Sequence, residues 1–235
     1  MIEMIETIRA AEEVSGLSRN SKSGTIVDFS EKQLIDRAKK GDADAFNDLM
    51  SRYSRTIFNI GLQMLRDRDD ASDMTQETML KVYRALPRFR GDSSFSTWVY
   101  RIMVNTCRDF LRSASRRREV PFSDFGEEED DTPVFDVAAD SVQPERLYIE
   151  GEDEQYLLSL IQGLKPAYRL AVTMRELGGL SYQEIADAGN VSIGTVKSRL
   201  NRARAAMREQ VLRDAEHFPS LARLMDKGGA EDGVC

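Results

Sequence analysis

The sequence predicts an all-α protein with two small helical domains joined by a flexible acidic linker. Apolar residues recur at three- and four-residue intervals over residues 30–118 and again over residues 153–212, as in amphipathic helices. No segment shows the alternation typical of a strand. Residues 119–152 contain three prolines and an acidic run with little periodicity, which is typical of a linker. A chain of 235 residues has room for two domains, each with a core.

The first helical stretch, residues 30–118, is expected to form one domain. Ser30 and Gln33 suit a capping box at its start, and Pro87 is expected to stop a later helix because proline cannot continue the backbone hydrogen bonding. The last helix leads into a basic cluster, Arg116–Arg118. We expect helices over residues 30–40, 44–65, 70–86 and 97–113.

The second helical stretch, residues 153–212, is expected to form the other domain. Its first helix begins near Asp153, and Pro166 suits the first position of the next helix. Residues 1–29 are expected to be a mobile extension and residues 213–235 a tail.

Residues 180–207, LSYQEIADAGNVSIGTVKSRLNRARAAM, have the signals of a helix-turn-helix. Ser181 and Glu184 can cap the first helix reciprocally. Gly189-Asn190 can take the positive-φ geometry that ends this helix, and Ser192 can cap a second one. The second helix would bury one face, formed by Val196, Leu200, Ala203 and Met207.

The opposite face of that second helix is polar and basic. Small and cationic side chains can enter a major groove and contact phosphates or base edges. A helical hairpin with a solvated basic face would show the same spacing, so the pattern alone leaves both interpretations open. The residues on and beside this face are Gly194, Lys197, Ser198, Asn201, Arg202, Arg204 and Arg208.

Charge is distributed unevenly along the chain. The net charge of −7 is unusual for a nucleic-acid binder, but residues 119–154 contain 14 acidic side chains and one basic one, Arg146. The rest of the chain therefore carries a net charge of +6. Because phosphate binding depends on the local field, this asymmetry favours two basic bodies beside an acidic segment.

Several classes of protein are excluded by composition. Two cysteines, Cys107 and Cys235, and one histidine, His217, exclude a disulfide framework and a conventional zinc site, so we expect no metal and no cofactor. No Gly-rich phosphate loop or catalytic group is present, so we do not expect an enzyme. No apolar run is long enough for a bilayer and no signal peptide is seen, which favours a cytoplasmic protein.

Two further surfaces in the first domain have a functional pattern. Around the loop after Pro87, aromatic side chains lie among arginines, and such a mixture can hold unstacked bases, although Phe95 and Trp98 could equally be core residues. The preceding helix has an acidic face that could dock a basic protein surface or simply be solvated.

Three stretches in this order resemble the extracytoplasmic-function sigma factors of bacterial RNA polymerase: DDASDMTQETMLKVYRAL, FRGDSSFSTWVYRIMVNTCRDFLR and the helix-turn-helix segment. The resemblance covers residues 31–118 and 150–212, and it is greatest for the branch controlled by envelope-stress anti-sigma factors. It implies a sigma region 2 domain over residues 30–118 and a sigma region 4 domain over residues 153–212. The acidic linker would enter the polymerase channels that nucleic acid occupies.

The resemblance implies a role for each surface. Docking on the polymerase β′ coiled coil would use Asp70, Asp73, Gln76, Glu77 and Leu80. The minus-10 element would be melted and held by Arg88, Phe89, Arg90, Gly91, Asp92, Ser93, Ser94, Phe95, Trp98, Arg101, Asn105 and Arg108. The minus-35 element would be read by Thr195, Lys197, Ser198, Asn201, Arg202 and Arg204.

Asn201 departs from the family pattern, because members often have an aromatic residue there. The side-chain amide of asparagine pairs best with an adenine edge. The resemblance therefore does not specify the minus-35 sequence that this chain would read.

The resemblance therefore implies an alternative sigma factor that acts as a monomer within the holoenzyme. Its partners would be core RNA polymerase, through the β′ coiled coil and the β flap, promoter DNA and an anti-sigma factor, with no small-molecule ligand. A stand-alone helix-turn-helix regulator would not explain the aromatic loop or the acidic face. A sigma mimic that no longer reads DNA should have lost Lys197, Arg202 and Arg204, which are present.

Overall fold

The computed structural model describes residues 29–118, 134–135 and 151–227, and these ranges contain helices and no strand. The prediction of an all-α chain with two helical domains is confirmed. The expectations for residues 1–28, 119–133, 136–150 and 228–235, including the acidic run of the linker, lie outside the described residues.

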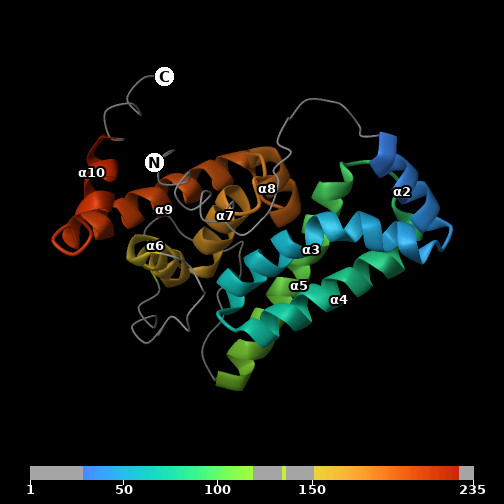
Figure 1. Cartoon of the computed structure of the whole chain (residues 1–235), viewed down its shortest axis with the longest axis horizontal. Coiled ribbons are helices and arrows are strands. Elements are labelled where there is room, and N and C mark those ends of the chain that lie inside the picture. Colours follow the sequence, from blue (N-terminus) through green and yellow to red (C-terminus); the bar gives the residue numbers. More distant parts are fainter. Residues whose placement is uncertain (1–28, 119–133, 136–150, 228–235) are drawn as a thin grey trace.

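The first domain is a helical bundle organised around its long second helix. That helix, α3, packs on α2, α4 and α5, and its Leu49, Ile57 and Ile60 side chains are completely buried. The elements are α2 (Phe29–Lys39), α3 (Ala43–Leu65), α4 (Arg68–Ala85), the short 3-10 turn η1 (Leu86–Arg88) and α5 (Phe95–Arg118) (Figure 1).

Helices α4 and α5 begin two residues before their predicted starts, because the capping side chain lies further upstream. Asp67 accepts a hydrogen bond from the Asp70 amide at 2.8 Å, so α4 starts just after Asp67. The Ser94 hydroxyl accepts one from the Thr97 amide at 3.1 Å and supports the start of α5.

The predicted cap of the first helix is wrong. Helix α2 begins at Phe29, so Ser30 lies within the helix instead of at its N-cap. Pro87 ends α4 as expected, but the chain continues for one 3-10 turn that contains the proline.

The second domain contains the predicted helix-turn-helix. The Ser181 hydroxyl accepts from the Glu184 amide at 3.2 Å, while the Glu184 carboxylate accepts from the Ser181 amide at 2.9 Å, which completes the capping box. Asn190 ends the first helix with φ 54, and Ser192 caps the next through the Thr195 amide. The helices are α6 (Glu152–Gly163), α7 (Pro166–Glu176), α8 (Tyr182–Gly189), α9 (Ile193–Arg213) and α10 (Pro219–Lys227).

Helix α10 lies where the sequence predicts only a tail. The Phe218 ring before it stacks on Tyr156 of α6 with centroids 3.9 Å apart, and Leu221 is almost fully buried. The Tyr156 hydroxyl also donates to Asp214 at 2.5 Å. These contacts join residues more than fifty positions apart, so local periodicity could not reveal them.

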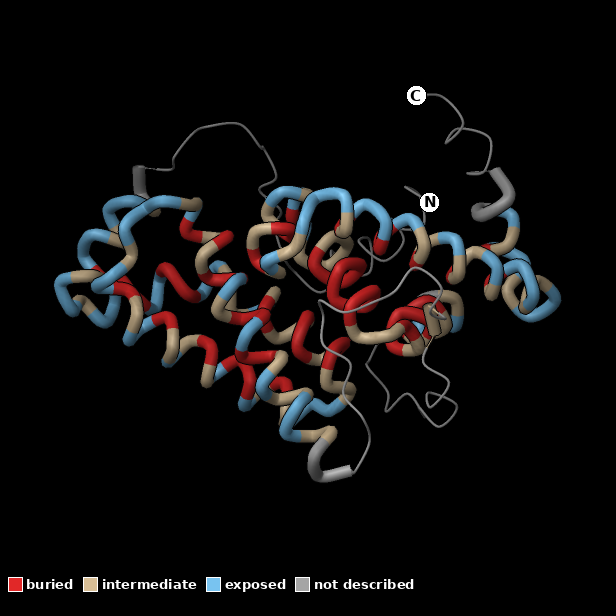
Figure 2. The backbone as a smooth tube through the Cα atoms, turned by 180° about the vertical axis from the view of Figure 1, so that it is seen from behind, coloured by how far each residue is buried: buried red, intermediate tan, exposed pale blue. Residues whose placement is uncertain are grey.

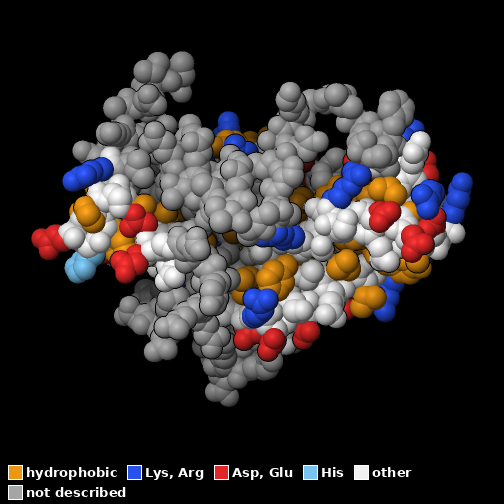
Figure 3. All heavy atoms as spheres, viewed as in Figure 1, with side chains coloured by type: hydrophobic (Ala, Val, Ile, Leu, Met, Phe, Trp, Pro, Cys, Tyr) orange, Lys and Arg blue, Asp and Glu red, His pale blue; other side chains and the backbone are white. Residues whose placement is uncertain are grey.

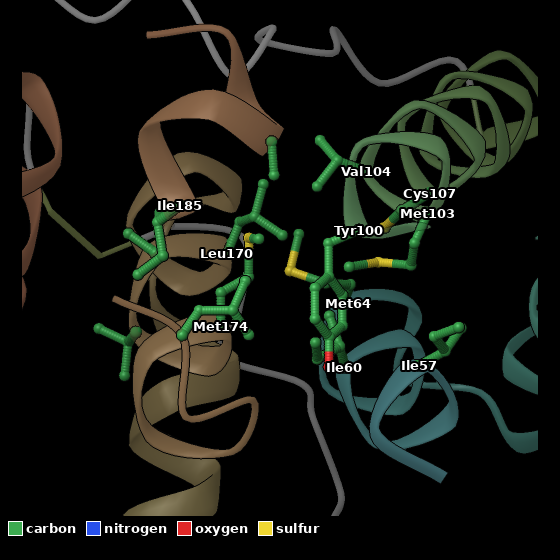
Figure 4. Packing of buried hydrophobic residues seen from close by; sticks show 14 of the residues in the cluster. Ile57, Ile60, Met64, Tyr100, Met103, Val104, Cys107, Leu170, Met174 and Ile185 are labelled. Atoms are coloured by element: carbon green, nitrogen blue, oxygen red, sulfur yellow. The ribbon is translucent and has the colours of Figure 1, made fainter. Parts of the chain in front are cut away.

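The two domains pack directly against each other. Helix α5 packs on α8 and helix α3 on α7, and the buried side chains of both domains form one continuous cluster. Figure 4 shows Leu170, Met174 and Ile185 on one side of this junction, facing side chains from α3 and α5. In Figure 2 the buried segments likewise continue from one domain into the other. The sequence predicts a core for each domain, and the structure joins the two.

Helix α5 can pack against both domains because it has two stripes of buried side chains. One stripe, Val99, Met103 and Thr106, is buried. A second stripe, Tyr100, Val104 and Cys107, is also buried and contributes to the junction in Figure 4. None of the described helices is long and apolar enough to cross a bilayer.

Replacing Ser181 with alanine removes the capping box of α8 and should lower the free energy of unfolding by about 1 kcal/mol. Thermal and urea denaturation of the full chain measure this loss. Ser198→Ala is the matched control, because Ser198 is exposed inside α9 and caps no terminus. Equal stability of the two variants would contradict the capping role.

Candidate nucleic-acid and protein interfaces

The acidic face of α4 also has exposed apolar side chains. Asp73 and Gln76 are exposed, Asp70 and Glu77 are half-buried, and Leu80 is 48% exposed. Acidic side chains gather at the lower edge of the molecule, beside the N-terminal end of α4 (Figure 3). Sequence reasoning missed Tyr83, which lies on the same helix and is 45% exposed. Large apolar side chains beside carboxylates are typical of a protein-docking surface.

An open cavity of about 450 Å³ lies between α4 and α5. Its lining combines cationic side chains with the small apolar surface of Ala85 and Ile102, which suits a planar base whose phosphates lie at the rim. Sequence reasoning found two of these residues and missed four, since the four become neighbours only when α4 packs on α5. The lining residues are Lys81, Arg84, Ala85, Arg88, Ile102 and Asn105.

The predicted aromatic cluster forms beside this cavity, but its members differ in exposure. Phe89, Phe95 and Trp98 contact one another with ring centroids 5.0–5.7 Å apart. Phe95 is 5% exposed and packs edge-on against Tyr53, so here it is a core residue and is not available to a base. Phe89 and Trp98 are half-buried and form the outer part of the cluster.

The loop before α5 is held at both of its ends. The Lys39 ammonium donates to the Phe89 carbonyl at 2.8 Å, and Ser94 caps α5. Gly91 makes a bend with φ +83, a conformation that favours glycine. Arg88, Arg90, Asp92 and Ser94 are exposed, and Ser93 is half-buried.

The cationic face of α5 meets the second domain. Arg101, Asn105 and Arg112 are exposed and Arg108 is half-buried, as expected for a polar face. However, the Arg101 Nε donates to the Asp187 carbonyl of α8 at 3.1 Å, and the Ser96 hydroxyl donates to Glu184 at 3.4 Å.

The outer face of α9 has the predicted arrangement. Val196, Leu200, Ala203 and Met207 are buried, while Lys197, Ser198 and Asn201 are exposed. Thr195 and Arg202 are half-buried at the edges of this face.

Arg204 has a different environment from the other candidate DNA contacts. Its guanidinium forms an ion pair with Glu176 of α7 at 2.9 Å, and both side chains are mostly buried. Burial alone would lower the pKa of Arg204, but the hydrogen bond and charge of Glu176 outweigh it and raise the pKa. Arg204 therefore links α9 to α7.

The described residues contain no group of His, Cys, Asp and Glu side chains that could hold a metal ion. Cys107 is fully buried, and burial raises the pKa of its thiol to about 12, so the group is neutral and unreactive at neutral pH.

Two families match the chain in the order of its domains. Sigma-70 region 2 matches residues 49–117, within the first domain, and Sigma-70 region 4 matches residues 154–207, within the second. The RNA polymerase sigma-H factor of Pseudomonas aeruginosa is 39% identical over 178 residues, which are 75% of this chain and 91% of that protein. The ECF RNA polymerase sigma-E factor of Escherichia coli K12 is 39% identical over 184 residues, or 78% and 95%.

Solved structures share the fold. CnrH in complex with the cytosolic domain of CnrY has a TM-score of 0.56 at 22% identity, covering 79% of this chain and 98% of that one. The sigma factor RpoE of Bartonella quintana, in complex with the anti-sigma factor NepR, has a TM-score of 0.52 at 20% identity, with 70% and 94% covered.

Replacing Glu176 with glutamine leaves Arg204 partly buried without its counter-charge, and we expect a loss of roughly 1–3 kcal/mol in unfolding free energy. Denaturation of the full chain measures it. In the matched control, Glu209→Gln, the partner Arg213 and the glutamate are both about two-thirds exposed, so the loss should stay below about 0.5 kcal/mol. Similar losses in both variants would contradict the linking role of Arg204.

Proposed function

The chain belongs to the extracytoplasmic-function group of sigma-70 factors, and from this membership we propose how its surfaces direct RNA polymerase to a subset of promoters. The observation that carries the proposal is the cavity between α4 and α5, which adjoins the aromatic loop and lies on the same two-helix unit as the acidic docking face. A single domain can therefore bind protein and DNA at once.

The acidic face of α4 would dock on the β′ coiled coil of core polymerase. Its carboxylates provide long-range attraction to a basic surface, and Leu80 and Tyr83 provide apolar area for the centre of the contact. Tyr83 packs edge-on against Phe46 of α3, with centroids 5.0 Å apart, so its ring is held in place before the partner arrives.

The cavity between α4 and α5 would receive one base of the melted minus-10 strand. Ile102 and Ala85 would contact the face of the base, and the amide of Asn105 would reach a base edge. Lys81, Arg84 and Arg88 would hold the phosphates on either side. Phe89 and Trp98 would support the neighbouring bases from outside the cavity.

Helix α9 would lie in the major groove of the minus-35 element. Lys197 and Arg202 would contact phosphates or guanine edges, and Asn201 would contact an adenine edge. The sigma region 4 domain would also bind the β flap.

Regulation by an anti-sigma factor follows from the family. A relative of the same fold is bound to the anti-sigma factor NepR. The chain would work in the cytoplasm, where core polymerase is found, and the polymerase would supply the metal ions and the chemistry.

Two substitutions should separate core binding from promoter reading in run-off transcription with core polymerase. Asp73→Arg reverses a charge on the docking face and should weaken core binding roughly tenfold or more. Arg202→Ala should leave core binding intact but reduce transcription from cognate promoters, at a cost of roughly 1–3 kcal/mol in recognition.

If wild-type chain supports no promoter-specific transcription, the proposed function is wrong. If it footprints promoter DNA alone, a stand-alone regulator is favoured.

Ala85→Leu should fill the cavity between α4 and α5 and reduce promoter opening roughly tenfold, because the base loses its stacking contacts. Permanganate reactivity of the minus-10 thymines measures opening, and gel filtration with core polymerase should show normal binding. Ala43→Leu, at an exposed position at the start of α3 and outside every proposed binding surface, is the control. Normal opening by the Ala85 variant would exclude base capture at this site.

A further inference from the structure

We propose that Lys39, the last residue of α2, positions the aromatic loop of the minus-10 surface, residues 89–94. In this role the ammonium acts on the main chain of the loop and not on DNA, so Lys39 is a positioning residue. The inference rests on the proposed function, because it concerns how the proposed minus-10 surface is held in shape. Helix α2 lies outside the Sigma-70 region 2 match, which begins at residue 49.

The Lys39 side chain reaches the start of the loop from another helix. Its ammonium donates a hydrogen bond to the Phe89 carbonyl at 2.8 Å, and the residue is half-buried. The Phe89 amide donates to the Leu86 carbonyl of η1, so Phe89 is where the chain leaves a regular turn and becomes extended. A hydrogen bond with one ionised partner is stronger than a neutral one, and partial burial strengthens it further. Lys39 therefore fixes the peptide group between Phe89 and Arg90.

The turn that follows α2 keeps Lys39 itself in place. Asp42 accepts a hydrogen bond from the Ala45 amide at 3.0 Å, which caps α3, and its carboxylate pairs with Arg37 at 2.8 Å. The Asp42 amide donates to the Arg37 carbonyl at 3.2 Å, and Gly41 takes φ +90 in the same turn. The end of α2 is thus fixed relative to α3, so Lys39 holds the loop from a rigid support.

The other end of α2 contacts the aromatic side chains beneath the loop. The Tyr53 hydroxyl donates to Glu31 at 2.6 Å, and the Tyr53 ring packs edge-on against Phe95 with centroids 5.6 Å apart. Phe95 in turn contacts the rings of Phe89 and Trp98. Burial and the hydrogen bond to Glu31 raise the pKa of Tyr53, so its hydroxyl stays protonated and continues to donate. Helix α2 therefore supports the loop from both of its ends.

The middle of the loop has open space around it. No atom beyond its chain neighbours lies within 4 Å of where a Cβ of Gly91 would be, and Arg90 and Asp92 beside it are exposed. The far end of the loop is fixed by Ser94, which caps α5. Without the Lys39 hydrogen bond the loop would be attached firmly at one end only. Ordering it when bases bind would then cost conformational entropy that the present structure has already lost on folding.

The effect of Lys39 should fall on promoter opening and not on the steps before it. The proposed core-docking face is on α4 and the proposed minus-35 surface is on α9, and Lys39 belongs to neither. Loss of its hydrogen bond should therefore leave the closed complex unchanged and slow only the step in which melted bases are held.

Opening kinetics of the holoenzyme test the proposal, on a promoter identified by run-off transcription. Lys39→Met keeps the apolar stem but removes the ammonium, and it should slow the opening step roughly tenfold without changing the equilibrium constant of the closed complex. Lys39→Arg keeps a cationic donor and should restore most of the rate. The matched control is Lys40→Met, which removes the same charge from the adjacent, exposed residue and should open the promoter at the wild-type rate.

A second readout needs neither promoter nor polymerase. Trp98 is the only tryptophan of the chain, and its ring centroid lies 5.0 Å from that of Phe89. Acrylamide should quench Trp98 fluorescence roughly twofold more efficiently in the full-length Lys39→Met chain, because the loop opens locally more often. The Lys40→Met chain should be quenched like the wild type, and urea denaturation verifies that each variant is folded.

Opening by Lys39→Met at the wild-type rate, or an equal loss in Lys40→Met, would overturn the positioning role. Unchanged quenching of Trp98 in a folded Lys39→Met chain would overturn it too. Failure of the wild-type holoenzyme to initiate rejects the proposed function, and the quenching then still decides whether Lys39 fixes the loop. Equal initiation by the wild type and Lys39→Met rejects only this inference.

Discussion

The packing of α5 on two sides at once is the constraint on which the rest of the structure depends. The helix presents three faces, roughly a third of a turn apart. Val99 and Met103 pack within the first domain, Tyr100 and Val104 belong to the junction with the second, and Arg101 and Asn105 remain at the surface. Arg101 on the cationic face also contacts α8 of the second domain. A movement of the second domain would therefore change how much of this face is accessible to a ligand.

Two surfaces of opposite charge lie side by side on one pair of helices. The acidic face of α4 and the cationic face of α5 belong to helices that pack on each other, and Lys81 lies where the two surfaces meet. Its ammonium is 3.4 Å from Asp109 and 3.8 Å from Glu77. Lys81 also lines the cavity, so the boundary between the surface proposed to dock core polymerase and the surface proposed to bind DNA runs through a single side chain.

Side chains satisfy backbone hydrogen-bonding groups at several helix ends. Side-chain oxygens of Asp42, Asp67, Ser181 and Ser192 satisfy amides at helix starts within each domain, which the chain achieves locally. The carbonyls at the ends of α3 and α6 are satisfied by arginines from across the junction. Local caps thus define the helices, and long-range caps define how the two domains sit together.

The sequence by itself determined what is local: the helical periods, the helix-turn-helix with its capping box, the turn at Asn190, the outer face of α9 and the bend at Gly91. Each depends on residues within one or two helical turns. Only the tertiary structure decided the rest, because it depends on residues far apart in the chain. In the tertiary structure Phe95 is buried, and Arg204 forms an ion pair with Glu176. The Phe218 ring before α10 stacks on Tyr156, and the cavity forms where α4 packs on α5. The tertiary structure also gave the stripe of Tyr100 and Val104 a second domain to pack against, which no spacing within α5 could specify.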